Sequence, residues 1–113
     1  MGRLIASSGT LAVGANSTSA EQVPADLITC PEAGTLILCA ACSAVTGAPS
    51  ANLLVGGESI INNKAVASIR STISVVYPED LMVQTKVNKG DALSLKFSWG
   101  GTGGNIAYTL ILI

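Results

Sequence analysis

The sequence contains no histidine, few charged residues and few aromatic residues. Histidine is the commonest general base, the usual partner of a nucleophilic serine or cysteine, and the commonest metal ligand. Its absence excludes hydrolysis by a Ser/His/Asp arrangement. Charged residues make up 12% of the chain, about half of the ~25% found in an ordinary soluble domain. The surface must therefore be covered largely by Ser, Thr, Asn, Gly and Ala.

The little charge that is present carries no pattern. The formal net charge is −1, and the six basic residues are scattered, with no aromatic residues interleaved with them in a stripe. Binding to a nucleic-acid backbone needs a basic stripe, so nucleic acid is not an expected partner. Surfaces that are nearly neutral tend to associate, because copies repel one another only weakly. Self-association is therefore expected.

Long hydrophobic runs are also missing. The longest apolar stretch, residues 36–45, is about half of the ~20 residues that a membrane-spanning helix needs. The apolar run at residues 4–6 ends at Ser7, which is too short for the core of a signal peptide. We therefore expect neither export nor a membrane partner, and the Asn16-Ser17-Thr18 glycosylation triplet is read as chance.

The chain has room for one domain with one core, residues 1–113. Residues 1–20 are a candidate for an extended N-terminal arm. Residues 92–99 and 81–87 alternate apolar and polar side chains with a period of two, which predicts half-buried strands. The turn Asn88-Lys89-Gly90-Asp91 between them predicts a hairpin.

Further strands are predicted at residues 10–13, 22–29, 35–45, 52–55, 72–77 and 105–113, while residues 65–69 fit either a weak strand or a helical turn. Closely spaced strands without an amphipathic helix predict an all-β fold, an antiparallel sandwich of two sheets.

Two of these strands are apolar on both faces, although only one face of a strand meets the core of a two-sheet sandwich. They are residues 35–45 and 105–113. Either loops of the same chain or another subunit could cover the second face, and we favour the subunit because such a patch otherwise invites aggregation. The predicted interface residues are Leu36, Leu38, Ala40, Cys42, Ala107, Ile111 and Ile113.

No group of residues predicts catalysis, a cofactor or a metal site. Cys39 and Cys42 are three apart on a strand and so point to opposite faces, which prevents them from chelating one ion or forming a disulfide. Together with Cys30, they are read as small packing residues. The glycines at 100–104 lack the Lys and Ser/Thr of a phosphate loop and are read as a hairpin loop. The acidic residues, Glu79 and Asp80 included, are read as solvated loop and turn residues.

Residues 31–113 resemble the small jelly-roll proteins of viral shells, in particular the cement or decoration proteins on the heads of tailed bacteriophages. Three segments carry the resemblance: Pro31-Glu32-Ala33-Gly34-Thr35-Leu36, the turn from Val87 to Leu93, and the aliphatic strand from Tyr108 to Ile113. A Lys-Gly-Asp-x-Leu turn also occurs in trimeric jelly rolls such as tumour-necrosis-factor and complement-C1q-like heads. The resemblance implies a single jelly roll of two four-stranded sheets, assembled about a symmetry axis that is often three-fold.

The leading hypothesis is therefore a non-enzymatic capsid protein. It would form a homotrimer, bind major capsid subunits on the surface of the virion, and assemble in the host cytoplasm. The alternative is a receptor- or carbohydrate-binding head of a viral fibre or spike. Sugar sites favour exposed aromatic residues, and alternation places Phe97 and Trp99 on the core face. An enzyme ranks third.

Overall fold

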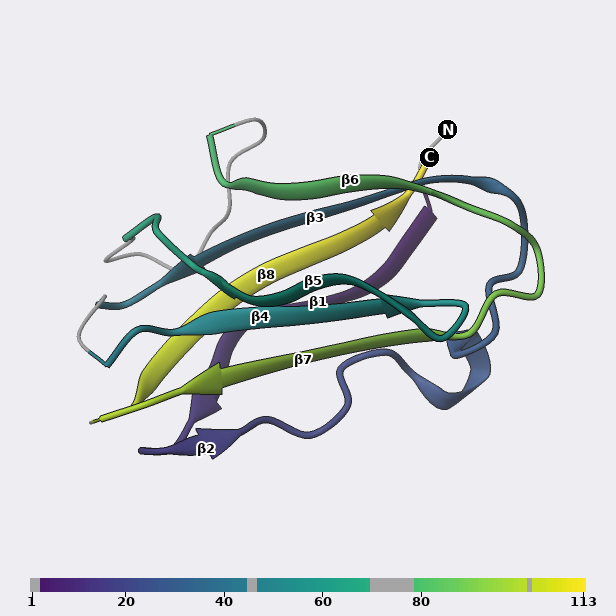
Figure 1. Ribbon diagram of the computed structural model, residues 1–113. Helices are drawn as coiled ribbons and strands as arrows, with labels where there is room; N and C mark the ends of the chain where they lie inside the picture. The colour runs from purple at the N-terminus through teal and green to yellow at the C-terminus, as the bar shows by residue number, and fades with distance from the viewer. Residues whose placement is uncertain (1–2, 45–46, 70–78, 102) are drawn as a thin grey trace.

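The computed structural model describes residues 3–44, 47–69, 79–101 and 103–113. Within these residues the chain forms eight β-strands and one short 3-10 turn (Figure 1). They are β1 (Arg3–Val13), β2 (Ser17–Thr18), η1 (Ala25–Leu27), β3 (Gly34–Cys42), β4 (Ser50–Val55), β5 (Glu58–Ala65), β6 (Leu81–Val87), β7 (Leu93–Trp99) and β8 (Gly104–Leu112).

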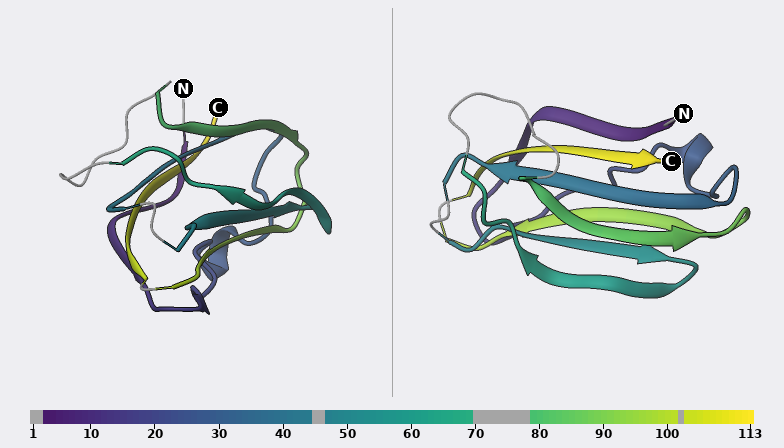
Figure 2. Two further views of the ribbon diagram at one scale, coloured as in Figure 1. Left: turned by 60° about the vertical axis from the view of Figure 1, so that its left-hand side comes forward. Right: turned by 90° about the horizontal axis from the view of Figure 1, so that it is seen from above.

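The strands form two antiparallel sheets packed face to face, which confirms the predicted all-β sandwich. Sheet A has the order β1-β8-β3-β6, and sheet B has the order β2-β7-β4-β5. The right-hand view of Figure 2 looks down on sheet A, with β1, β8, β3 and β6 side by side. Among the strands of the described residues, only β4 and β5 are consecutive and paired with each other, and each of the other successive pairs has one strand in each sheet.

The hairpin predicted between residues 81–87 and 93–99 is wrong. Both strands exist, but β6 pairs with β3 in sheet A, and β7 pairs with β4 in sheet B. The turn itself is compact, because the Asn88 N–H donates to Asp91 Oδ2 at 2.8 Å and the Asp91 N–H donates to the Asn88 carbonyl at 3.1 Å. Such a turn reverses the chain without choosing its partner. The glycine-rich connection after Trp99 is likewise no hairpin, since it joins β7 of sheet B to β8 of sheet A.

Within the segment considered as an arm, residues 3–13 form a full strand of sheet A. Residues 3–13 pair with β8 along its whole length, with two register shifts. Ile5, Ala6 and Val13 are buried in the core between the sheets, which fastens β1 to the sandwich. The strand predicted at residues 10–13 covers only the end of β1. The two register shifts lie earlier in β1, and there the side chains do not alternate regularly between the two faces.

Three other predictions differ from the structure. Residues 22–29 contain the 3-10 turn η1 in place of a strand, and Thr29 makes only an isolated bridge to Ala92. The strand β5 was missed, because its sequence ESIINNKA does not alternate and Asn63 has a φ of 53°. Residues 65–69 form neither a helix nor a regular strand after Ala65, and only Ile69 bridges to Cys42. The predicted strand at residues 72–77 lies outside the described residues.

The core lies between the two sheets and is built from alternate residues of the central strands. Phe97 of β7 and Tyr108 of β8 join the layers, with ring centroids 5.1 Å apart and planes tilted by 42°. Burying one large apolar side chain contributes roughly 1.5–3 kcal/mol relative to leaving it exposed. The core residues of the four central strands are Leu36, Leu38, Ala40 and Cys42 of β3, Ala51, Leu53 and Val55 of β4, Leu93, Leu95, Phe97 and Trp99 of β7, and Ile106, Tyr108, Leu110 and Leu112 of β8.

Candidate functional site

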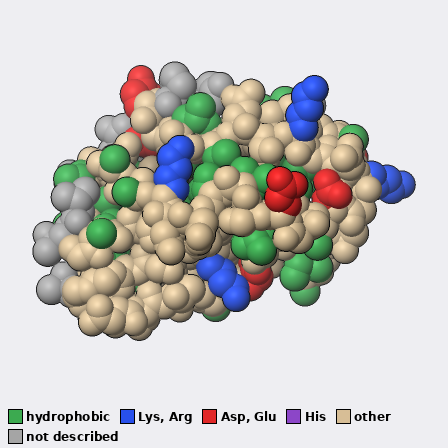
Figure 3. All heavy atoms as spheres, in the orientation of Figure 1, with side chains coloured by type: hydrophobic (Ala, Val, Ile, Leu, Met, Phe, Trp, Pro, Cys, Tyr) green, Lys and Arg blue, Asp and Glu red, His purple; other side chains and the backbone are tan. Residues whose placement is uncertain are grey.

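The two outer faces of the sandwich differ in chemistry. The outer face of sheet B carries mainly polar side chains, because the residues of β4 and β7 that alternate with the core are polar apart from Leu54. Thr18 and Ser98 pair across β2 and β7, with their hydroxyl oxygens 3.1 Å apart, and Asn52 lies opposite Lys96. Figure 3 shows one side of the molecule, on which the Lys, Arg, Asp and Glu side chains are scattered and form no cluster of one sign. A face of this kind is suited to water.

The outer face of sheet A is mainly apolar, although Ser7, Thr109 and Gln84 also lie on it. Leu4, Ile111 and Ile37 lie in one row across β1, β8 and β3. The row beside it contains Thr109 and Cys39. We call the apolar residues of this face the sheet A patch; they are Leu4, Ile37, Cys39, Ala41, Ala107, Ile111 and Ile113. Leu4 and Ile113 are well exposed, whereas the residues at positions 37, 39, 41 and 107 are at most 8% exposed.

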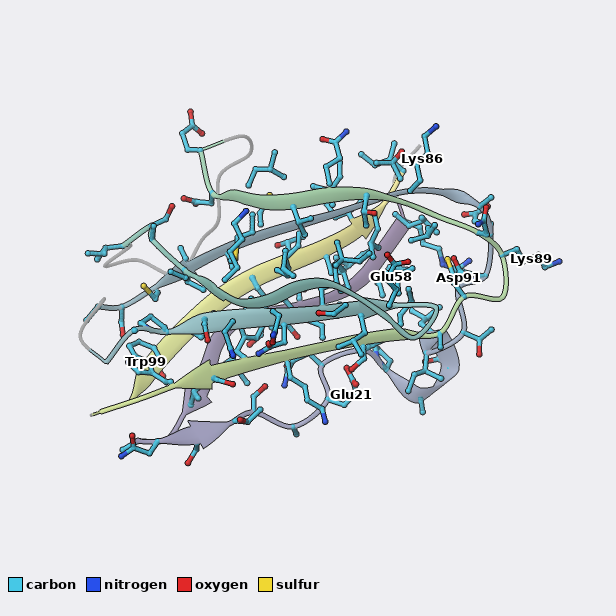
Figure 4. The ribbon with its side chains drawn as sticks, viewed as in Figure 1. Glu21, Glu58, Lys86, Lys89, Asp91 and Trp99 are labelled. Carbon is cyan, nitrogen blue, oxygen red and sulfur yellow. The ribbon has the colours of Figure 1, made fainter. Side chains whose placement is uncertain are left out.

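Charge near the sheet A patch lies at its border. Lys86 of the edge strand β6 lies opposite Thr35, and Thr35 in turn exchanges two backbone hydrogen bonds with Ile113, each of 2.8 Å. Figure 4 shows Lys86 at this border, with its side chain directed away from the sandwich. Lys86 therefore lies outside the apolar part of the patch, whereas the buried carboxylate of Asp80 is close enough to act on Cys39.

A hollow of about 310 Å³ opens in the middle of the sheet A patch. Its lining is apolar apart from one threonine, so it can hold an aliphatic group by van der Waals contact but offers few hydrogen bonds to a polar ligand. Leu4 and Ile113 of the same patch are 55% and 59% exposed. The lining residues are Ile37, Cys39, Thr109, Ile111 and Ile113.

The structure brings together only part of the predicted interface. Ala107, Ile111 and Ile113 lie on the outer face of sheet A, where residues of an interface with another subunit would have to lie. The other four residues lie in the core and are at most 2% exposed, so they have no surface to offer a partner. These four residues of β3 are Leu36, Leu38, Ala40 and Cys42.

The four residues of β3 were assigned to the outer face for a simple reason. Both faces of β3 are apolar, and alternation alone does not say which of them meets the other sheet. Ile37, Cys39 and Ala41 are the residues that point outward, since each lies one position from a core residue. Leu4 was missed because no strand was predicted at its position, and no signal in the sequence distinguishes it.

The cysteines are free thiols, and two of them occupy opposite sides of one strand. Cys42 lies in the core, where its Sγ donates to the carbonyls of Val66 and Ser68 at 3.4 and 3.3 Å. Cys39 lines the hollow on the other side of β3, which confirms the prediction that the two point to opposite faces. In the described part of the chain, no three Cys, Asp or Glu residues form a group that could hold a metal ion.

Burial makes these thiols poor nucleophiles. It raises the pKa of Cys39 above the ordinary value of 9.0, and the negative charge of Asp80 adds to the effect. Burial also raises the pKa of Cys42, against the opposing effect of backbone hydrogen bonds. The thiolate is the reactive form, so both side chains stay neutral and unreactive at physiological pH.

Two acidic residues hold parts of the fold together through hydrogen bonds. Glu21 lies beside β7 (Figure 4), where its carboxylate accepts from Ser94 Oγ at 2.5 Å and from the Leu95 N–H at 2.6 Å. Asp80 is only 2% exposed, so its interpretation as a solvated turn residue is wrong. Its carbonyl accepts the Ala40 N–H at 3.0 Å, which ties the chain before β6 to β3.

The aromatic residues within the described ranges are all inside. Phe97, Trp99 and Tyr108 are at most 3% exposed, so the core positions predicted for Phe97 and Trp99 are confirmed. Burial raises the pKa of the Tyr108 phenol, as does the nearby charge of Glu21. None of these rings is available to stack on a sugar.

Comparisons of the chain with protein-family models, curated proteins and solved structures found no match. Among the described residues, no helix is long and apolar enough to span a membrane.

Proposed function

We propose that this chain is a single jelly-roll protein of a viral shell, which acts by binding other proteins and not by catalysis. The support for a jelly roll is the strand order. Eight strands form two four-stranded sheets, β1-β8-β3-β6 and β2-β7-β4-β5, and jelly rolls consist of eight strands in two sheets that follow two Greek-key paths.

The observation that carries the proposal is the contrast between the two outer faces. A sandwich that stayed alone in water would be expected to have polar residues on both, as sheet B has. The sheet A patch instead presents an apolar hollow and two aliphatic side chains that are more than half exposed, Leu4 and Ile113, and apolar groups on an outer sheet face support contact with another protein. Sheet A would meet its partners, and sheet B would face the solvent.

This arrangement suits a cement or decoration protein on the surface of a capsid. The patch would contact copies of the chain and major capsid subunits, with no cofactor required. The resemblance to phage decoration proteins implies a trimer in the virion, with assembly in the host cytoplasm. Contact through a neutral apolar surface also avoids the free-energy cost of desolvating charged groups. Ion pairs buried in an interface add little net affinity, because this cost offsets most of their attraction.

The test is binding of the purified protein to bacteriophage heads that lack their decoration protein. Sedimentation should show the wild-type chain on heads, and Ile111→Asp should abolish binding by placing a charge in the patch. Leu54→Asp, on the polar outer face of sheet B, is the matched control and should bind as the wild type does. Circular dichroism would verify that both variants fold. Failure of the wild-type chain to bind any such head would refute the proposal.

The fibre or spike head gains no support from the site. Binding of sugars through stacked aromatic rings needs exposed rings, and those of Phe97, Trp99 and Tyr108 are in the core. A glycan array would decide the matter, since reproducible binding of one glycan class would favour the alternative over a capsid protein.

A further inference from the structure

The connection from β1 to β3 runs along the outer edge of β7. We call residues 14–22 of this connection the strap; it lies between Val13 and Val23, which are both 4% exposed and belong to the core. Residues 14–22 all belong to the described part of the chain, and none of their side chains is buried. The strap is therefore fixed to the core at its two ends, and between them hydrogen bonds hold it in place.

The hydrogen bonds between the strap and β7 run in both directions. The Ser19 N–H donates to the Phe97 carbonyl at 2.6 Å, and the Gln22 N–H donates to the Leu95 carbonyl at 2.9 Å. In return, the Phe97 N–H donates to Ser19 Oγ at 2.9 Å, and the Leu95 N–H donates to Glu21 Oε2 at 2.6 Å. Side chains thus take the place of the carbonyls that a regular neighbouring strand would offer. Of these two side-chain acceptors, the carboxylate is the one that acid can protonate.

The carboxylate of Glu21 joins the strap to β7 at several points (Figure 4). Besides the Leu95 N–H, it accepts Ser94 Oγ at 2.5 Å and the Val23 N–H at 3.3 Å. An ionised carboxylate only accepts hydrogen bonds, and its charge strengthens them. A protonated carboxyl group loses that charge and carries an O–H donor, which would face other donors here. One proton therefore weakens all of these contacts at once.

The other ionisable groups around Glu21 belong to neighbouring strands. Lys96 lies two positions from Ser94 on the same face of β7, and Tyr108 of β8 donates its hydroxyl to Gln22 Oε1 at 2.8 Å. Burial raises the pKa of Tyr108, as does the charge of Glu21. In acid a lysine keeps its positive charge and a tyrosine stays neutral. Between neutral and acid pH, Glu21 is therefore the group whose charge changes at this place.

We infer that the strap is a cover of the β7 edge that acid pH releases, because protonation of Glu21 frees residues 14–22 from β7 while the two sheets stay together. The valines that flank the strap limit the opening to this segment. Opening exposes the N–H groups of Leu95 and Phe97 at the edge of sheet B, and an open edge can pair with a strand of another chain. The inference goes beyond the proposed function, which uses the outer face of sheet A.

Amide hydrogen exchange within β7 tests the inference, because successive residues of a strand direct their N–H groups to opposite sides. Those of Leu95 and Phe97 point to the strap, whereas that of Lys96 points to β4, where it lies opposite Asn52. NMR would give the protection factor of each amide at about pH 7 and about pH 3, a range that spans the titration of glutamate side chains. At the lower pH, Leu95 and Phe97 should lose protection by roughly tenfold or more, and Lys96 should keep it.

Two variants assign the effect to one carboxylate. Glu21→Gln supplies an acceptor oxygen that does not titrate, so the acid-induced loss at Leu95 and Phe97 should disappear. Asp26→Asn, at an exposed acidic residue beyond the strap, is the matched control and should show the same loss as wild type. Equal losses in Glu21→Gln and wild type would overturn the inference. So would a simultaneous loss at Lys96, because the sandwich would then open as a whole, and so would the absence of any loss at Phe97.

A disulfide across the strap provides a second measurement. Thr18 of β2 lies opposite Ser98 of β7, with their hydroxyl oxygens 3.1 Å apart. Residues directly opposite each other in antiparallel strands have Cα atoms roughly 4.5–5.5 Å apart, which a disulfide can span. Thr18→Cys combined with Ser98→Cys should lock the strap when oxidised. We expect the acid-induced loss at Phe97 to vanish in the oxidised form and to return after reduction; the same loss in both forms would overturn the inference.

Discussion

The carboxylate of Glu21 closes the edge of β7 at Leu95. Glu21 Oε2 accepts the Leu95 N–H at 2.6 Å, and Ser19 Oγ accepts the Phe97 N–H at 2.9 Å. Both acceptors are side chains in a segment beyond the end of β2, so they replace the carbonyls that a longer neighbouring strand would provide. An open strand edge can pair with other chains, and this segment blocks such pairing.

Removal of this carboxylate should destabilise the fold. Glu21→Ala leaves the Leu95 N–H and the Ser94 hydroxyl without their acceptor, and we expect a loss of about 1–3 kcal/mol in the free energy of unfolding. Glu21→Gln keeps an acceptor oxygen and should lose less. Urea denaturation at neutral pH measures both. Glu58→Ala, at an exposed residue, is the control and should stay within about 0.5 kcal/mol of wild type.

Two glycines separate the effect of close packing from that of backbone conformation. Gly47 and Gly57 both have a positive φ, of 87° and 81°. A Cβ on Gly47 would lie 1.9 Å from the Gly100 carbonyl oxygen, whereas a Cβ on Gly57 would have nothing within 4 Å. Gly57→Ala should therefore cost only the conformational term of about 1–2 kcal/mol.

Gly47→Ala should cost clearly more, about 4 kcal/mol or failure to fold, because the backbone at Gly100 must move as well. Thermal unfolding followed by circular dichroism would rank the two variants. Similar melting temperatures for both would contradict the close approach of the two loops.

Alkaline pH should weaken the fold through its buried thiols. The folded-state pKa of Cys39 and of Cys42 is raised above 9.0, so the unfolded chain loses these protons first as pH rises. Stability is then complete below pH 9 and declines above it. Tyr108, whose pKa is raised above 10.0, adds a further decline above pH 10. Urea denaturation over this range should give a shallower decline for Cys39→Ala and for Cys42→Ala than for wild type.

The open side of the sandwich is bridged by Lys64. Its Nζ donates to the Met82 carbonyl oxygen at 2.5 Å, and this contact joins β5 at the edge of sheet B to β6 at the edge of sheet A. Lys64→Met keeps the aliphatic stem but removes the donor, and we expect a loss of about 1 kcal/mol. Amide hydrogen exchange should rise in β5 and β6. Lys96→Met, on the outer face of sheet B, should leave the exchange in both strands unchanged.

Local alternation was a sound guide to individual strands. It located β6 and β7 and placed Phe97 and Trp99 on the core side. It missed β5, where Asn63 has a positive φ and the register shifts twice against β4. Alternation together with the short turn also led to the wrong prediction that β6 pairs with β7. A turn of four residues fits a hairpin and a connection between the two sheets equally well.

What the sequence determined by itself was the fold class and the existence of surplus apolar surface. A period of two requires strands, and strands apolar on both sides leave one apolar face outside any two-layer sandwich. Only the tertiary structure decided which face that is. Leu36 and Ile37 are equally apolar neighbours, yet the first packs against sheet B and the second lines the outer hollow. The reason is that alternation is local, whereas the face that meets the core depends on pairing with β8, about seventy residues further along the chain.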